Sequence, residues 1–345
     1  MFLFRADGNS RIGSGHVMRC LSIADAANRA GEKCVFVTAS DDMSGLIRAR
    51  RQESRILGTD YRRMEEEGIL SVVEACRPSM VIVDSYFVTE KYLYELKDWC
   101  GKAGSRLVYI DDRKAFPYPC HVLLNYNIYG AEADYRELYR DTPLPELMVG
   151  TEYAPLRREF LEAGAREVKT EARDVFVSTG GADSRHLSLE LMKALDFKTP
   201  KSGGLTFHFV VGSMNPDKEA LRELAEKKNV RLYENVTEMA KLMASCDIAI
   251  SAAGSTLYEL CATRTPTVTY VLEDNQAPIA GGFSSRGIME NCGDIRDLGG
   301  ERLAARLIES AERLADDFRE RCRISCKMKS LADGRGAERI VERLL

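Results

Sequence analysis

The chain begins Met1-Phe-Leu-Phe-Arg-Ala-Asp-Gly-Asn-Ser-Arg-Ile-Gly-Ser-Gly-His-Val-Met-Arg19. This stretch predicts a short apolar strand over residues 1–4, a glycine-rich loop, and a helix that begins near His16. Small residues let a backbone approach a ligand closely, and the free amides of a helix N-terminus suit a phosphate or a developing anion. The spacing Gly13-x-Gly15-His16 lacks the third glycine of the dinucleotide fingerprint, so a nicotinamide or flavin site is not expected.

Apolar runs alternate with helical patterns through the rest of the chain, which is typical of a parallel sheet covered on both faces. Strands are predicted over residues 1–4, 34–38, 80–83, 106–110, 122–125, 174–178, 205–211, 230–233, 248–251 and 267–270. Helices are predicted over residues 16–30, 43–51, 69–75, 91–102, 156–163, 184–195, 218–227, 237–244 and 256–263.

A length of 345 residues favours two domains rather than one. The predicted fold is therefore α/β, with two Rossmann-like doubly wound domains and a cleft between them. We place these domains at residues 1–152 and 153–345, because the sequence changes from a short glycine- and proline-containing run to a charged helix near this point. The helical, charged C-terminal stretch could pack back against the first domain.

Composition excludes several classes of protein. The net charge of −4 and the lack of a long basic block argue against a nucleic-acid partner. No apolar run approaches the ~20 residues of a membrane helix, and no charged segment precedes an apolar one at the N-terminus, so neither membrane insertion nor a signal peptide is expected. The ten cysteines are scattered without a CxxC pair, which predicts reduced thiols and a cytoplasmic protein. No His or Cys pair has metal-ligand spacing, and we expect no metal or other cofactor.

Ligands of open α/β sheets bind at the carboxyl ends of the strands. In the first half these ends carry the first loop, Asp84-Ser85-Tyr86 and Asp111-Asp112. In the second half they carry two runs of small residues, 178–183 and 251–256. Two such edges facing each other would make one site between the domains.

The second half offers several groups for a nucleoside diphosphate. Ser255 or Thr256 can cap a helix at which a phosphate binds, and Glu259, one turn further on, can bind ribose hydroxyls. An ordinary capping box is the alternative. Gly180-Gly181 either lines the same diphosphate or makes a plain left-handed turn, and Asn275-Gln276 either binds sugar groups or forms a surface turn.

In the first half, His16 is the candidate general base. The alternative is a histidine at a helix start that only binds phosphate or has no role. Arg5 and Asp7 could form a buried pair that shapes the loop, and Asp84 could orient His16 or bind an acetamido N–H. The remaining histidines, at positions 121, 186 and 208, are expected to be structural. Neither a GxSxG elbow nor a GxxxxGK[ST] loop is present, which argues against a serine hydrolase and a P-loop enzyme.

These segments recur in order in one known family. The set comprises Arg5-x-Asp7, Ile12-Gly13-x-Gly15-His16-x-x-Arg19, Val83-Asp84-Ser85-Tyr86, Ile110-Asp111-Asp112, Asn125-x-Asn127, Tyr153-Ala154-x-Leu156-Arg157-x-Glu159-Phe160, Gly180-Gly181-x-Asp183, Ala253-Gly254-Ser255-Thr256-x-x-Glu259 and Asn275-Gln276. It resembles the UDP-sugar hydrolases of pseudaminic acid biosynthesis, which act on UDP-2,4-diacetamido-2,4,6-trideoxy-β-L-altropyranose.

The resemblance implies a glycosyltransferase-B-like fold, with the nucleotide bound mainly by the second domain and His16 as the base. Water would attack the anomeric carbon with inversion, and UDP would leave. The predicted substrate- and UDP-binding residues are Arg5, Asp7, Gly13, Gly15, Arg19, Asp84, Tyr86, Gly180, Gly181, Asp183, Gly254, Ser255, Thr256, Glu259, Asn275 and Gln276.

Three positions depart from the family pattern: Pro155 replaces a leucine, His121 an acidic residue, and Arg264 a glycine. Two other functions stay open, namely a UDP-amino-sugar glycosyltransferase similar to that of peptidoglycan synthesis, and a nucleotide-sugar-binding protein without turnover. The expected partner is a small UDP-sugar, with neighbouring pathway enzymes on other chains.

Overall fold

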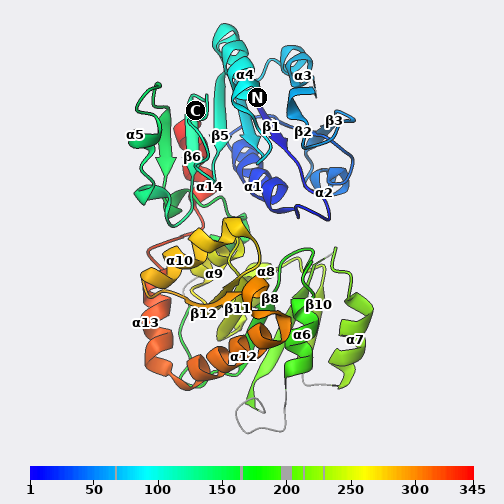
Figure 1. The fold of residues 1–345 in the computed structure, drawn as a ribbon, viewed down its shortest axis with the longest axis vertical. Helices are drawn as coiled ribbons and strands as arrows, with labels where there is room; N and C mark the ends of the chain where they lie inside the picture. The colour runs from blue at the N-terminus through cyan, green and yellow to red at the C-terminus, as the bar shows by residue number, and fades with distance from the viewer. Residues whose placement is uncertain (67, 164–165, 196–203, 213, 228–229) are drawn as a thin grey trace. The chain divides into compact units, whose positions relative to one another are not determined.

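The computed structural model describes residues 1–345 except 67, 164–165, 196–203, 213 and 228–229. The chain forms two compact units (Figure 1). Unit 1 comprises Met1–Leu156 and Arg335–Leu345, and unit 2 comprises Arg157–Gly334. The sequence placed this division between residues 152 and 153. Of the C-terminal helices, α14 (Gly336–Leu344) belongs to unit 1, where it packs its apolar face on α1 (Gly15–Arg29).

Unit 1 contains one sheet with the strand order β3-β2-β1-β4-β5-β6-β7, in which all neighbouring strands are parallel. The strands are β1 (Phe2–Ala6), β2 (Cys34–Thr38), β3 (Glu53–Ile56), β4 (Met80–Asp84), β5 (Arg106–Ile110), β6 (Val122–Asn125) and β7 (Glu146–Val149). Besides α1 and α14, the helices are α2 (Ser44–Ala49), α3 (Ile69–Cys76), α4 (Glu90–Ala103) and α5 (Tyr135–Leu138), with 3-10 turns at η1 (Met64–Glu66), η2 (Gly130–Glu132) and η3 (Thr151–Tyr153).

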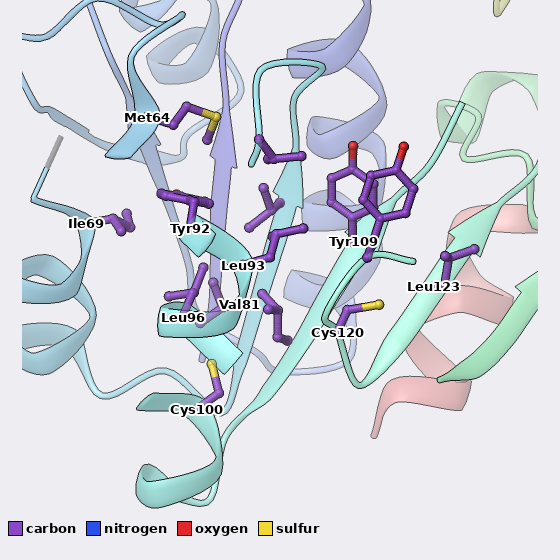
Figure 2. Packing of buried hydrophobic residues seen from close by; sticks show 14 of the residues in the cluster. Met64, Ile69, Val81, Tyr92, Leu93, Leu96, Cys100, Tyr109, Cys120 and Leu123 are labelled. Carbon is purple, nitrogen blue, oxygen red and sulfur yellow. The ribbon is translucent and has the colours of Figure 1, made fainter. Parts of the chain in front are cut away.

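The core of unit 1 lies on both faces of this sheet, because successive strand residues point to opposite sides. Leu3 and Val37 belong to a buried cluster that includes the apolar residues of α3 and α4. The alternate residues Phe4 and Phe36 stack with ring centroids 4.9 Å apart, and α1 contacts β1. Figure 2 shows part of the first cluster, with labels on Met64, Ile69, Val81, Tyr92, Leu93, Leu96, Cys100, Tyr109, Cys120 and Leu123.

Unit 2 contains a second parallel sheet with the order β10-β9-β8-β11-β12-β13. Its strands are β8 (Asp174–Ser178), β9 (Thr206–Val211), β10 (Val230–Glu234), β11 (Ile248–Ala252), β12 (Thr267–Val271) and β13 (Glu290–Asp294). Its helices are α6 (Leu187–Ala194), α7 (Lys218–Lys227), α8 (Met239–Ser245), α9 (Thr256–Thr263), α10 (Ala277–Ser285), α11 (Ile295–Leu298), α12 (Gly300–Asp316) and α13 (Phe318–Met328), with 3-10 turns at η4 (Arg158–Phe160) and η6 (Asp274–Gln276). None of the helices in the described part of the chain is long and apolar enough to cross a membrane.

The predicted fold class of two doubly wound α/β domains is confirmed, and all of the predicted strands form. Three further strands, β3, β7 and β13, were not predicted. Each lies at an edge of its sheet, where part of its surface is exposed, and β3 and β13 also lack a continuous apolar run.

The predicted helix over residues 156–163 is wrong. The segment forms only the short turn η4, which begins after Arg157, a residue with extended backbone (φ −65°, ψ 148°). Tertiary contacts replace the helix, because Phe160 is buried and the Glu159 carboxylate accepts a hydrogen bond from the amide of Ala240 at 3.0 Å.

Arg264 occupies a backbone conformation that favours glycine. It follows α9 with φ 55° and ψ 35°, and the next amide, of Thr265, donates to the Leu260 carbonyl at 3.0 Å. This is the left-handed helix end at which the resembled family has glycine. We expect Arg264→Gly to raise the free energy of unfolding by about 1 kcal/mol and the melting temperature by about 2–4 °C. Arg264→Ala keeps the Cβ and serves as the control in thermal unfolding. Equal melting temperatures for the two variants would contradict the prediction.

Candidate functional site

The order of strands in the unit 1 sheet changes direction between β1 and β4. Strands β2 and β3 lie on one side of β1, and β4 to β7 lie on the other, so the loops that follow β1 and β4 lead to opposite sides. Ala6 at the end of β1 pairs with Asp84 at the end of β4, which aligns the two carboxyl ends. Ligands of doubly wound sheets bind at this switch point. It is also where the structure gathers four of the predicted residues: His16, Arg19, Asp84 and Tyr86.

His16 and Asp84 form a hydrogen-bonded pair. The His16 Nδ1 atom lies 2.6 Å from Asp84 Oδ1, and Asp84 is fully buried. Burial by itself would raise the pKa of Asp84, but the adjacent Arg19 and His16 outweigh it, so the pKa of this carboxyl is lowered. The ionised carboxylate can only accept, so Nδ1 carries a proton, and in the neutral imidazole Nε2 then has the lone pair. This arrangement suits a general base.

Arg19 lies between two carboxylates. Its Nε and one terminal nitrogen donate to Asp84 at 2.6 and 2.5 Å, and it contacts Asp112 at 2.8 Å. Burial by itself would raise the pKa of Asp112, but the charge and hydrogen bond of Arg19 outweigh burial, so the pKa of Asp112 is lowered. One guanidinium and two carboxylates leave a net charge of −1 beside His16.

Tyr86 connects the second carboxylate to the histidine. Its hydroxyl donates to Asp112 Oδ2 at 2.8 Å, and its ring meets the His16 ring edge-on, with centroids 4.5 Å apart and an interplanar angle of 81°. Burial and the Asp112 charge raise the pKa of Tyr86, so the phenol stays protonated. The imidazole is thus held in position on two sides.

The first loop is shaped by residues that were predicted to bind substrate. Arg5 is fully buried and donates to Asp7 at 2.6 Å, while Asp7 accepts from the amide of Ala39 at 2.7 Å. Gly13 has φ 73°, as the tight turn requires. Gly15, the first residue of α1, is exposed. We interpret Arg5 and Asp7 as residues that fix the loop carrying His16.

Unit 2 has its own switch point between β8 and β11, whose ends are aligned by the pairing of Ser178 with Ser251. The loops beyond them carry the predicted glycines at 180, 181 and 254, and Gly180 has φ 90°. Ser255 precedes α9 but its side chain makes no capping hydrogen bond, so both the predicted Ser255 cap and the capping-box alternative are wrong. Within the described residues, the amides of Ser255 and Thr256 donate to no acceptor. They are available to an anion.

Two of the predicted residues in unit 2 have side chains that accept hydrogen bonds from backbone amides. Asp183 is buried, and its carboxylate accepts from the amides of Leu187 and Ser188 at 3.0 and 2.9 Å, at the start of α6. Gln276 Oε1 accepts from the amide of Leu272 at 2.8 Å. Asn275 lies beside it in η6.

Glu259 has a partner that sequence reasoning did not assign to the site. Arg157 donates to Glu259 Oε1 at 3.2 Å and lies 2.8 Å from Glu159 Oε1. Burial raises the pKa of Glu259; Arg157 opposes this shift, and Glu159 adds to it. In the sequence, the segment Arg157-x-Glu159-Phe160 supported the family resemblance, but Arg157 was not among the predicted binding residues.

Further side chains complete the site in unit 1. Tyr126 accepts from Arg19 at 2.8 Å, Asn127 donates to Asp112 at 2.8 Å, and Tyr129 donates to the Asp112 carbonyl at 2.8 Å. The paired aspartates after β5 and the Asn-x-Asn spacing after β6 were the available signals.

Two other residues noted in the sequence are structural. Asp111 accepts from the amides of residues 113 and 114 and from Tyr135 Oη, and His121 Nδ1 accepts from the Leu107 amide at 2.8 Å. In the ranges that the structure describes, no three His, Cys, Asp or Glu side chains are arranged as metal ligands.

The chain is similar in sequence and fold to several known proteins. Residues 174–313 match the glycosyltransferase family 28 C-terminal domain. The UDP-2,4-diacetamido-2,4,6-trideoxy-β-L-altropyranose hydrolase of Campylobacter jejuni is 28% identical over 74% of this chain and 86% of its own. The predicted resemblance is confirmed.

A bifunctional relative from Helicobacter pylori is named as a pseudaminic acid cytidylyltransferase and the same hydrolase. It is 28% identical over 81% of this chain, which spans about half (46%) of that longer protein. MurG of Acinetobacter baumannii has a similar structure, with a TM-score of 0.66 at 12% identity over 99% of this chain and 98% of that one. This likeness assigns the glycosyltransferase-B fold.

Proposed function

We propose that the chain hydrolyses UDP-2,4-diacetamido-2,4,6-trideoxy-β-L-altropyranose to UDP and the free sugar. The observation that carries the proposal is the His16–Asp84 pair, which leaves Nε2 as a base at the carboxyl edge of the unit 1 sheet. The similarity to the Campylobacter hydrolase supplies the substrate. All ten cysteines are free, which supports a cytoplasmic location.

In this mechanism, His16 Nε2 takes a proton from a water molecule as the water oxygen attacks the anomeric carbon. The bond between that carbon and the phosphate oxygen breaks, and UDP leaves with the electron pair. Attack from the opposite face inverts the anomeric configuration. Asp84 keeps the imidazole in the required tautomer and stabilises the imidazolium that forms.

Unit 2 would hold the nucleotide. The amides of Ser255 and Thr256 at the start of α9 would bind the diphosphate, with Gly180, Gly181 and Gly254 allowing close approach. The same amides and the helix dipole would stabilise the negative charge that builds up on the leaving group. Glu259 would accept hydrogen bonds from the ribose hydroxyls.

The test is UDP release from this UDP-sugar in buffer with chelator and without any acceptor, followed by NMR of the sugar. Prompt release of a free sugar with inverted configuration supports the proposal. Release that requires an added sugar acceptor would instead identify a transferase, the alternative compatible with the family 28 domain. UDP binding without release from any UDP-sugar would identify a binding protein.

A further inference from the structure

We propose that Arg157 is a positioning residue that holds Glu259 in the orientation needed to bind the ribose of the nucleotide. The inference rests on the proposed function, because it takes the nucleotide site to lie at the start of α9. It assigns a role to a side chain 102 positions away from Glu259 in the sequence.

Arg157 contacts one of the two carboxylate oxygens of Glu259. Arg157 donates to Oε1 of Glu259 at 3.2 Å. In the described part of the chain, Oε2 of Glu259 accepts no hydrogen bond, and the side chain retains 19% of its exposure. One oxygen is therefore fixed by the protein while the other is open to a ligand. A ribose presents two adjacent hydroxyl donors, which such a carboxylate oxygen can accept.

Arg157 is itself held by contacts to other residues of unit 2. It pairs with Glu159 at 2.8 Å, and its guanidinium carbon lies 5.1 Å from the centroid of the Phe160 ring. Glu159 is fixed in turn by the Ala240 amide at the start of α8. These contacts come from η4 and α8, so the guanidinium position does not depend on Glu259 alone.

The position of the Arg157 side chain leaves one of its hydrogen-bond donors unsatisfied. Its Nε is buried and, within the described residues, has no hydrogen-bond partner. An unsatisfied buried N–H is costly, and its retention calls for a reason. Orientation of the terminal nitrogens toward Glu259 and Glu159 is such a reason.

The charges around Glu259 give Arg157 a further effect. Burial and the nearby Glu159 carboxylate both favour the protonated form of Glu259, and Arg157 is the group that favours the carboxylate. A protonated carboxyl loses much of its strength as an acceptor of hydroxyl hydrogen bonds. Loss of Arg157 would remove both the contact that fixes Oε1 of Glu259 and the charge that opposes the upward shift of its pKa, so we expect ribose binding to weaken.

The test compares the dissociation constants of UDP and 2′,3′-dideoxy-UDP for the full chain at pH 7.5. We expect the protein to prefer UDP by about 10- to 100-fold, because the two hydroxyls bond to a charged group. In Arg157→Leu this preference should fall to about twofold, and Glu259→Gln should give the same loss. The double variant should lose no more than either single one, since both changes remove one interaction. Arg157→Lys, which keeps the charge, should restore part of the preference.

Arg158→Leu is the matched control, because Arg158 is the exposed neighbour and pairs with Glu162 instead. It should keep the full preference. If Arg157→Leu weakens both ligands equally, Arg157 is merely structural and the inference is overturned. If Glu259→Gln abolishes the preference but Arg157→Leu keeps it, the inference fails while the nucleotide site stands. If the unaltered protein binds no UDP, the proposed function fails first.

Discussion

His16→Ala is expected to lower kcat for UDP release by about 10³-fold while the dissociation constant of UDP changes by less than about twofold. The imidazole Nε2 is the base of the proposed reaction, and alanine leaves no group to take the proton from water. UDP binding is assigned to unit 2, whereas His16 lies on α1 of unit 1, so the affinity for the product should not depend on this side chain. Single-turnover hydrolysis and calorimetric UDP binding measure the two quantities separately.

His186→Ala provides a matched control for this experiment. His186 also pairs with an aspartate, Asp217, at 2.6 Å, but the histidine is about half exposed and lies in unit 2. Its removal should leave kcat near that of the unaltered protein. Retention of most of the activity in His16→Ala, with UDP still bound, would show that another group is the base.

Arg321→Met is expected to lower the free energy of unfolding by about 3–5 kcal/mol, a loss large enough to reduce the melting temperature by about 10 °C. Arg321 is fully buried on α13 and donates to four backbone carbonyls. Two of them, Leu314 and Ala315, end α12, and the other two, Lys169 and Thr170, precede β8. Burial lowers the pKa of Arg321, but its ordinary value is so high that the side chain stays charged.

The cost arises because methionine fills the volume but supplies no donor. The last carbonyls of α12 have no partner within the helix, and methionine leaves them without the donors that the guanidinium supplied. Arg323→Met on the same helix is the control, since Arg323 is exposed and pairs with Glu320 at the surface. Thermal unfolding followed by circular dichroism compares the two variants. An equal, small shift for both would contradict a structural role for Arg321.

The parts of the fold that depend on local pattern could be predicted from the sequence. Buried parallel strands are continuous apolar runs, so β2, β5, β6 and β8 were predicted with the bounds that the structure has. The edge strands β3 and β13 lack that signal because they are partly exposed to solvent, and β13 has the sequence Glu-Asn-Cys-Gly-Asp. The segment around Arg157 has a helical pattern but is held by side-chain contacts to α8 and α9, which local propensity does not contain.

The candidate site likewise combines features that local sequence pattern predicts with contacts that depend on the tertiary structure. The sequence by itself determined that two doubly wound halves follow each other and that glycine loops, His16 and Glu259 stand at strand exits, because strand-to-helix transitions are local. The sequence also offered Asp84 as a residue that could orient His16, but only the tertiary structure placed the two side chains in contact and paired Arg157 with Glu259. His16 and Asp84 are 68 positions apart, and Arg157 and Glu259 are 102 apart. Their contacts depend on strand order, register and helix packing, which join distant segments and leave no trace in the spacing of residues along the chain.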